Sequence, residues 1–282
     1  MKQEKLRRAV AAATSTASAL GLKVEDAVVL HNSNKLTARL LPCDLLARIA
    51  EERGDNRRNA DFEAEIAQRL AETESPAAAL DPRVEPRRYV RDGFVITFWT
   101  YYEPAAGRSI EPTEYAQALE RLHAGMRRID IPSPHFTDRI AEAEALVGDR
   151  AQSPRLKDVD RELLSDALRT LRQSIAGRGA EEQLLHGEPH PGNLISTKRG
   201  LLFVDLETCC RGPVEFDIAH APIQVSEHYP HADQAMVREC RTLTLAMVTS
   251  WRWDREDQLP DGIRLGREGL RQLRAELTSP RP

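Results

Sequence analysis

Residues 184–221 constrain this chain more than any other part of its sequence. The segment reads LLHGEPHPGNLISTKRGLLFVDLETCCRGPVEFDIAHA, with a strand-like run, LLFVDL, between glycine-containing turns. Its polar side chains are of the kinds that bind metals or move protons: His186, Glu188, His190, Asn193, Asp205, Glu207 and Asp217. Carboxylates gathered around a strand are costly to bury unless they meet hydrogen-bond partners or a cation. The pattern therefore predicts a functional site rather than an ordinary piece of core.

The same segment resembles the catalytic loop and metal-binding region of the aminoglycoside phosphotransferase family, which has a protein-kinase-like fold. In that family an HGDxHxxN loop precedes a strand that ends in a metal-binding Asp. Here residues 186–193 read HGEPHPGN and residues 204–207 read VDLE. Residues 212–213 and 217–219, GP and DIA, are similar to the family's "GP…DLA" element. The resemblance is tight across 184–221 and weakest in the C-terminal helices.

This resemblance implies transfer of the γ-phosphate of ATP (or GTP) to a hydroxyl, assisted by Mg2+. Asn193 and Asp205 would hold the metal, because the turn and strand between them let the chain fold back. Glu188 stands where the family has Asp, and it would position and deprotonate the acceptor hydroxyl. Glu207 is either a further metal ligand or an acceptor behind the metal ligands. Asp217 is expected to accept backbone N–H bonds from the catalytic loop.

The opening third of the chain is expected to cover the nucleotide. Ser33 and Asn34 lie in a polar turn between the first two strands, where kinases place a Gly-rich loop, although this turn has no glycine. Trp99 and Tyr101 are expected to belong to the hinge whose backbone groups hydrogen-bond the nucleotide base. The predicted nucleotide site therefore includes residues of both this turn and the hinge.

A cation is expected on the third strand of this region. Arg48 occupies the place of the family's phosphate-pairing lysine, and Glu65 (or Glu63) in the following helix is its candidate ion-pair partner. Arginine is longer and planar, so the exchange is not neutral. Lys35, beside the polar turn, is the rival phosphate contact.

Hydrophobic periodicity predicts an α+β protein with two lobes, a small antiparallel sheet lobe and a larger, mainly helical lobe. The family resemblance implies that this is a two-lobe protein-kinase-like fold. A buried strand at 27–30 is followed by strands at 36–41, 45–50, 87–90 and 94–99, with a helix at 59–72. Helices are expected at 112–128, 134–147, 157–175, 231–251 and 261–277, interrupted by one strand at 201–206. The predicted division is 1–103 for the nucleotide-covering lobe and 104–282 for the lobe with the catalytic loop and substrate site.

Composition narrows the functional classes. The formal net charge is −4, which argues against a dedicated nucleic-acid binder. No apolar run approaches the length that spans a bilayer, and the first twenty residues suit an amphipathic helix better than a targeting peptide. Four cysteines without a C-x-x-C pair fit reduced thiols in a cytoplasmic protein.

Two alternatives stay open beside the phosphotransferase of a small hydroxylated metabolite or antibiotic. Glu188, Arg48 and the glycine-free turn all depart from the family pattern, which would suit a catalytically degenerate kinase-fold binding protein. His186, Glu188 and His190 also spell H-x-E-x-H, which would suit a metal-dependent hydrolase. No motif in the C-terminal helices identifies the acceptor, and the oligomeric state is likewise left open.

Overall fold

The structure is a computed structural model that describes residues 1–33 and 35–278. The chain forms two compact units whose segments alternate along the sequence. Unit 1 comprises Met1–Glu111, Ala124–Asp130 and Gly192–Thr208, and unit 2 comprises Pro112–His123, Ile131–Pro191 and Cys209–Pro282. The assignment of 1–103 and 104–282 to the two functional lobes stays a prediction.

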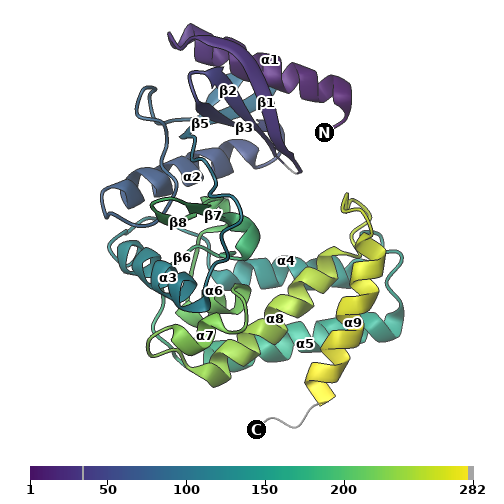
Figure 1. Cartoon of the computed structure of the whole chain (residues 1–282). Helices are drawn as coiled ribbons and strands as arrows, with labels where there is room; N and C mark the ends of the chain where they lie inside the picture. Colours follow the sequence, from purple (N-terminus) through teal and green to yellow (C-terminus); the bar gives the residue numbers. More distant parts are fainter. Residues whose placement is uncertain (34, 279–282) are drawn as a thin grey trace. The chain divides into compact units, whose positions relative to one another are not determined.

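Unit 1 is built on an antiparallel sheet with the strand order β1-β2-β3-β5-β4. Its strands are β1 (Val24–Asn32), β2 (Leu36–Pro42), β3 (Leu45–Glu51), β4 (Tyr89–Arg91) and β5 (Phe94–Thr100). Helix α1 (Gln3–Ala19) lies across this sheet (Figure 1). Its buried alanines, among them Ala9 and Ala13, let the helix approach the alternate residues of β2 that face it, Leu36 and Leu40. Unit 1 thus has its own hydrophobic core.

The expectation that residues 27–30 form a buried strand is wrong about burial. Val28, Val29 and Leu30 are 42%, 38% and 47% exposed. The reason is topological, because β1 is an edge strand and only its first half, including Val24 and Ala27, packs against the core under α1. A short apolar run does not by itself distinguish a buried strand from an exposed edge strand.

Unit 1 also contains helix α2 (Asn56–Ala71) and a hairpin of β7 (Leu194–Thr197) and β8 (Gly200–Phe203). Single-turn 3-10 helices lie on either side of the hairpin, η1 (Pro191–Asn193) and η2 (Leu206–Thr208). The expected strand at 201–206 therefore ends three residues early, because the chain leaves the ladder after Phe203. The hairpin brings Asn193 and Asp205, which precede and follow it, to the same end.

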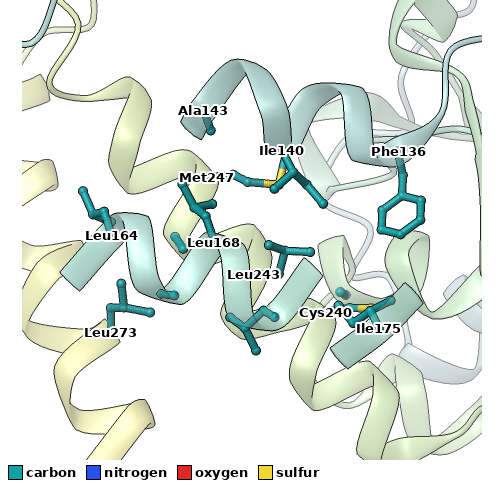
Figure 2. Close-up of a cluster of buried hydrophobic side chains, with 14 of the residues drawn as sticks. Phe136, Ile140, Ala143, Leu164, Leu168, Ile175, Cys240, Leu243, Met247 and Leu273 are labelled. Atoms are coloured by element: carbon teal, nitrogen blue, oxygen red, sulfur yellow. The ribbon is translucent and has the colours of Figure 1, made fainter. Parts of the chain in front are cut away.

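Unit 2 is mainly helical. The five predicted helices are found within a few residues of their expected bounds, whereas two short helices, at 214–220 and 225–228, were not among the predicted spans. The helices of unit 2 are α4 (Phe136–Gly148), α5 (Asp158–Gly177), α6 (Val214–His220), α7 (Val225–His228), α8 (Gln234–Trp251) and α9 (Gly262–Thr278), and α3 (Pro112–Met126) begins in this unit. Leu164, Leu168 and Ile175 form the buried stripe of α5, which packs with side chains of α4, α8 and α9 (Figure 2). Short strands β6 (Gln183–Leu185) and β9 (Cys210–Gly212) pair beside the loop of residues 186–193.

The prediction of a single strand in this half of the chain is wrong, since β6, β7 and β9 are also present. Each has only three or four residues, which is too short for a readable alternation of apolar and polar positions. The fold class is confirmed: a small antiparallel sheet accompanies a larger helical part. Within residues 1–33 and 35–278, no helix combines the length and apolar character that crossing a membrane requires.

Candidate active site

Unit 1 contains an apolar pocket of about 260 Å³. Leu30 of β1 and Leu46 of β3 contribute to its wall from the sheet, and Ile195 and Val204 contribute from the hairpin. The exposure of Leu30 is therefore explained, because its side chain lines a pocket instead of a core. Leu30 was not among the predicted site residues, although an apolar residue just before a polar turn at a strand end was the available signal.

Trp99 and Tyr101, predicted as hinge residues, line the same pocket. The Trp99 indole Nε1 donates to Thr97 Oγ1 at 2.9 Å, and the Arg39 guanidinium lies over the Tyr101 ring at 3.9 Å. These contacts hold both rings in place, so this wall of the pocket is preorganised. Their role in base binding stays a prediction.

The polar end of the pocket is formed by Arg48 and Asp205. Arg48 Nη2 donates to Asp205 Oδ1 at 2.6 Å, while Nη1 donates to Glu63 Oε1. Burial alone would lower the pKa of the Arg48 guanidinium, but the Glu63 and Asp205 carboxylates outweigh it and raise the pKa above its usual range. Arg48 is therefore a permanent cation that bridges two carboxylates from distant parts of the chain.

Of the two candidate partners for Arg48, the preferred one, Glu65, is wrong and Glu63 is right. Glu63 is 1% exposed, whereas Glu65 is 53% exposed and lies 3.8 Å from Arg69 on the same helix. Glu63 and Glu65 are two positions apart, and such residues point in directions about 200° apart around a helix. Only one of them can therefore point to the sheet. The buried Ile66 lies three positions beyond Glu63, on the same face, and this spacing could have decided the choice.

Lys35 joins the same network. Its Nζ lies 3.4 Å from Glu63 Oε2 and also pairs with Glu207 Oε2. Burial raises the pKa of the Glu207 carboxyl above its usual value, and Lys35 counteracts this effect. The network thus joins two cations to three carboxylates, and its oxygen donors are of the hard kind that magnesium prefers.

The two proposed metal ligands are brought together by the hairpin. Val204 N donates to Asn193 O at 3.0 Å, so Asn193 and Asp205 lie at neighbouring positions across its open end. Asp205 adopts a left-handed backbone conformation, with φ of 68°, which is uncommon outside glycine and clusters at functional sites. The donor set of one amide and one or two carboxylates fits Mg2+, and the ligand assignments stay predictions.

The predicted polar turn is only partly described. Ser33 N donates to Lys35 O at 3.1 Å, which closes the turn at the start of β2, and the Ser33 side chain is exposed. Asn34 lies outside the described residues. A phosphate contact from this turn therefore stays a prediction.

In unit 2, Asp217 braces the catalytic loop as predicted. Its two carboxylate oxygens accept from the backbone N–H groups of His186 and Gly187, each at 2.8 Å. His123 Nε2 lies 2.9 Å from Asp217 Oδ2, and Tyr229 Oη is 2.8 Å from the other ring nitrogen. Burial alone would raise the pKa of Asp217, but His123 and the His186 backbone outweigh it and lower the pKa. His123 and Tyr229 carry no sequence signal for this role.

Glu188 forms an ion pair that the sequence analysis missed. Arg139 Nη2 lies 2.6 Å from Glu188 Oε1, and the Arg139 guanidinium lies over the Trp251 ring at 5.0 Å. His186 is fully buried, and its Nδ1 accepts from the Glu188 backbone N–H at 3.3 Å. Glu188 is thus held from both its backbone and its side chain.

The zinc-hydrolase alternative is not favoured. Across the part of the chain that the structure describes, no three His, Cys, Asp or Glu side chains are grouped to hold a metal ion. His186 is instead engaged with the loop backbone, and Glu188 is engaged with Arg139. A magnesium site built from Asn193, Asp205 and nucleotide phosphates needs no such trio of side chains.

The family model of the phosphotransferase enzyme family (APH) matches residues 20–257. The chain belongs to this family. Both the resemblance stated above and the protein-kinase-like fold are thereby confirmed, and the two alternatives to a phosphotransferase are not favoured. A search of curated protein sequences found no match.

Several solved structures share the fold. An amicoumacin kinase, hAmiN, solved in complex with AMP-PNP and Ca2+, has a TM-score of 0.70 and 11% identity over 99% of this chain and 97% of its own. The GDP complex of aminoglycoside 2'-phosphotransferase-IIIa has a TM-score of 0.69 and 12% identity over 98% and 100%. A choline/ethanolamine kinase family protein from Mesorhizobium loti has a TM-score of 0.66 and 16% identity over 95% of each chain. At these identities the likeness concerns the fold alone.

Proposed function

We propose that this chain is an O-phosphotransferase that moves the γ-phosphate of ATP or GTP to a hydroxyl of a small molecule. The observation that carries the proposal is the meeting of Arg48, Glu63 and Asp205 at the polar end of an apolar pocket. A nucleotide has the complementary form, because its base is flat and largely apolar on its faces while its phosphates are anionic. Solved complexes of similar folds with AMP-PNP and with GDP support either nucleotide.

The residues of unit 1 would bind and orient the nucleotide. The base would lie between Leu30, Leu46 and Val204, near the segment that follows β5. Arg48 and Lys35 would face the phosphates, and Asn193 and Asp205 would hold Mg2+. When bound, magnesium neutralises phosphate charge as the γ-phosphoryl group leaves.

The residues of unit 2 would handle the acceptor. Glu188 would accept a hydrogen bond from the acceptor hydroxyl and take its proton as the new phosphate ester forms. The loose transition state of phosphoryl transfer asks little of a base, so the main task of Glu188 is to orient the oxygen. Asp217 fixes the loop backbone from behind, which keeps Glu188 at a constant position.

A nucleotide-consumption screen over hydroxylated metabolites and antibiotics tests this proposal. We expect formation of nucleoside diphosphate that depends on both an acceptor and magnesium. Isothermal titration with the same preparation measures nucleotide binding with and without magnesium. Nucleotide binding that is equally tight with and without magnesium, together with no phosphate transfer to any acceptor, would contradict the proposal and indicate a binding protein instead.

A further inference from the structure

Glu188, the proposed base, forms an ion pair with Arg139 that three elements of unit 2 surround. Arg139 projects from α4, Glu188 comes from the catalytic loop, and Trp251 ends α8, so three elements of unit 2 hold one guanidinium. The Arg139 side chain is 17% exposed and that of Glu188 is 23% exposed. A positive charge is thus fixed next to the carboxylate that the proposed function assigns to the acceptor hydroxyl.

Arg139 has hydrogen-bonding capacity that the described residues do not use. One of its terminal nitrogens, Nη2, pairs with Glu188, whereas the other, Nη1, is buried and has no hydrogen-bond partner. A buried donor without an acceptor is costly, and the cost is higher when the donor is charged. Guanidinium presents a planar fork of donors whose geometry matches a carboxylate. The free part of the fork is therefore suited to an anionic oxygen of a ligand.

A second orphaned donor or acceptor lies in the same neighbourhood. His220, at the end of α6, has a buried Nε2 without a hydrogen-bond partner, and its ring packs edge-on against Phe216 with centroids 5.2 Å apart. Burial lowers the pKa of His220 to about 4, with Glu188, Asp217, Arg139 and His190 as the charged or titratable groups around it. At neutral pH the imidazole is uncharged and can donate one N–H bond without adding positive charge.

We propose, resting on the function proposed above, that the acceptor is a hydroxylated carboxylic acid whose carboxylate binds Arg139 Nη1 while its hydroxyl meets Glu188. The uncharged imidazole of His220 would supply a further N–H donor for the same substrate. A guanidinium nitrogen only donates hydrogen bonds, so a cationic acceptor such as an amino alcohol would leave Arg139 Nη1 unsatisfied through its ammonium group, whereas a carboxylate would satisfy it. The geometry thus selects by charge, and Arg139 is a specificity-determining residue.

Acidic side chains that could have attracted a cation are engaged elsewhere in unit 2. Glu239 lies 2.8 Å from Arg178, and Asp233 lies 3.3 Å from the same arginine. Asp233 also caps the N-terminus of α8 by accepting from the Ala235 backbone. Both carboxylates therefore already have a cationic partner within unit 2.

The test uses acceptors that share one carbon skeleton and differ in charge. One set is gluconate, glucitol and glucamine, and a second is glucuronate, glucose and 6-amino-6-deoxyglucose. Binding of each compound to the full chain with magnesium nucleotide is measured by ligand-observed NMR, and phosphate transfer is measured by nucleotide consumption. We expect the carboxylate member of a set to bind about 10- to 100-fold more tightly than the amine, which is the value of one or two charge-assisted bonds. Equal binding of the three members, or preference for the amine, overturns the inference.

Variants separate charge recognition from positioning of Glu188. Arg139→Gln should abolish the preference for the carboxylate, and Arg139→Lys should restore part of the preference because it keeps the charge without the fork. Arg172→Gln is the matched control, since Arg172 also pairs with a glutamate, Glu144, at 3.4 Å in the same unit. A preference that survives in Arg139→Gln would overturn the inference. Absence of nucleotide binding and of all phosphate transfer would instead contradict the proposed function. The two outcomes are distinguishable, because the charge preference is measured by acceptor binding alone.

Discussion

Replacing Asp217 with Asn tests how the catalytic loop is held. The carboxylate is fully buried and accepts from His186 N and Gly187 N through separate oxygens, while His123 Nε2 lies 2.9 Å from Oδ2. Asparagine offers one oxygen, so its NH2 group must face a backbone N–H. The variant loses a charge-assisted bond, worth about 1.5–3 kcal/mol, and leaves a buried donor unsatisfied, at about 1–3 kcal/mol. Relief from burying a charge offsets part of this, so we expect a loss of about 2–4 kcal/mol in the free energy of unfolding.

Urea denaturation measures that loss, and amide hydrogen exchange at His186 and Gly187 shows whether it is local. Asp166→Asn is the matched control, because Asp166 is 66% exposed and pairs only with Arg169 in the next turn, so we expect a change below about 0.5 kcal/mol. The pKa of Asp217 is lowered in the folded state, so its stabilisation is present above the unfolded pKa of about 3.9 and is lost as the pH falls through the folded pKa. A loss in Asp217→Asn no larger than in the control, with unchanged exchange at Gly187, would refute the reasoning.

Three further predictions concern unit 1. Asp205→Ala should lower turnover by about 10³-fold through loss of a proposed metal ligand while the fold stays intact, and retained turnover would remove the mechanism. Glu63→Gln should reduce the free energy of unfolding by about 2 kcal/mol, because Arg48 and Lys35 lose a buried counter-charge. The control Glu65→Gln should change the free energy of unfolding by less than about 0.5 kcal/mol. Equal effects of the two variants in urea denaturation would contradict the assignment of Glu63. Leu30→Ser should weaken nucleotide binding about fivefold in calorimetry, which is equivalent to about 1 kcal/mol of lost apolar contact. The control is Val90→Ser, because Val90 is 45% exposed and lies on the other edge strand. This control should leave nucleotide binding unchanged.

Local patterns predicted the elements and the catalytic loop well, because both are written in consecutive residues. The helix at 157–175 appears as α5 (Asp158–Gly177), and the Asp92-Gly93 turn joins β4 to β5. The acidic residue behind the loop, Asp217, was also foreseen, since its role follows from its position at a helix near the loop. The helices and the hairpin needed only periodicity and turn chemistry, whereas the loop and the role of Asp217 followed from the family resemblance.

What the sequence did not predict depends on contacts between distant segments. Arg139 lies inside a predicted helix, yet nothing in that helix indicates that its guanidinium meets Glu188, which is 49 positions away. The partner of Arg48 required a choice between two glutamates that only the buried face of α2 resolves. Leu30 was read as core because an exposed edge strand and a buried strand have the same composition.

The exchange of lysine for arginine at position 48 is accounted for by the network around it. Lysine carries one compact charge, whereas the two terminal nitrogens of Arg48 reach different carboxylates, Glu63 from α2 and Asp205 after β8. Lys35, directly before β2, adds a second positive charge beside Glu63 and Glu207. Three carboxylates still outnumber two cations. Burial raises the pKa of Glu207, so a further cation nearby would stabilise the charged form of this carboxylate. A divalent ion at Asp205 would supply that charge and would free Arg48 to bind phosphate, which is why the departure from lysine is compatible with phosphoryl transfer.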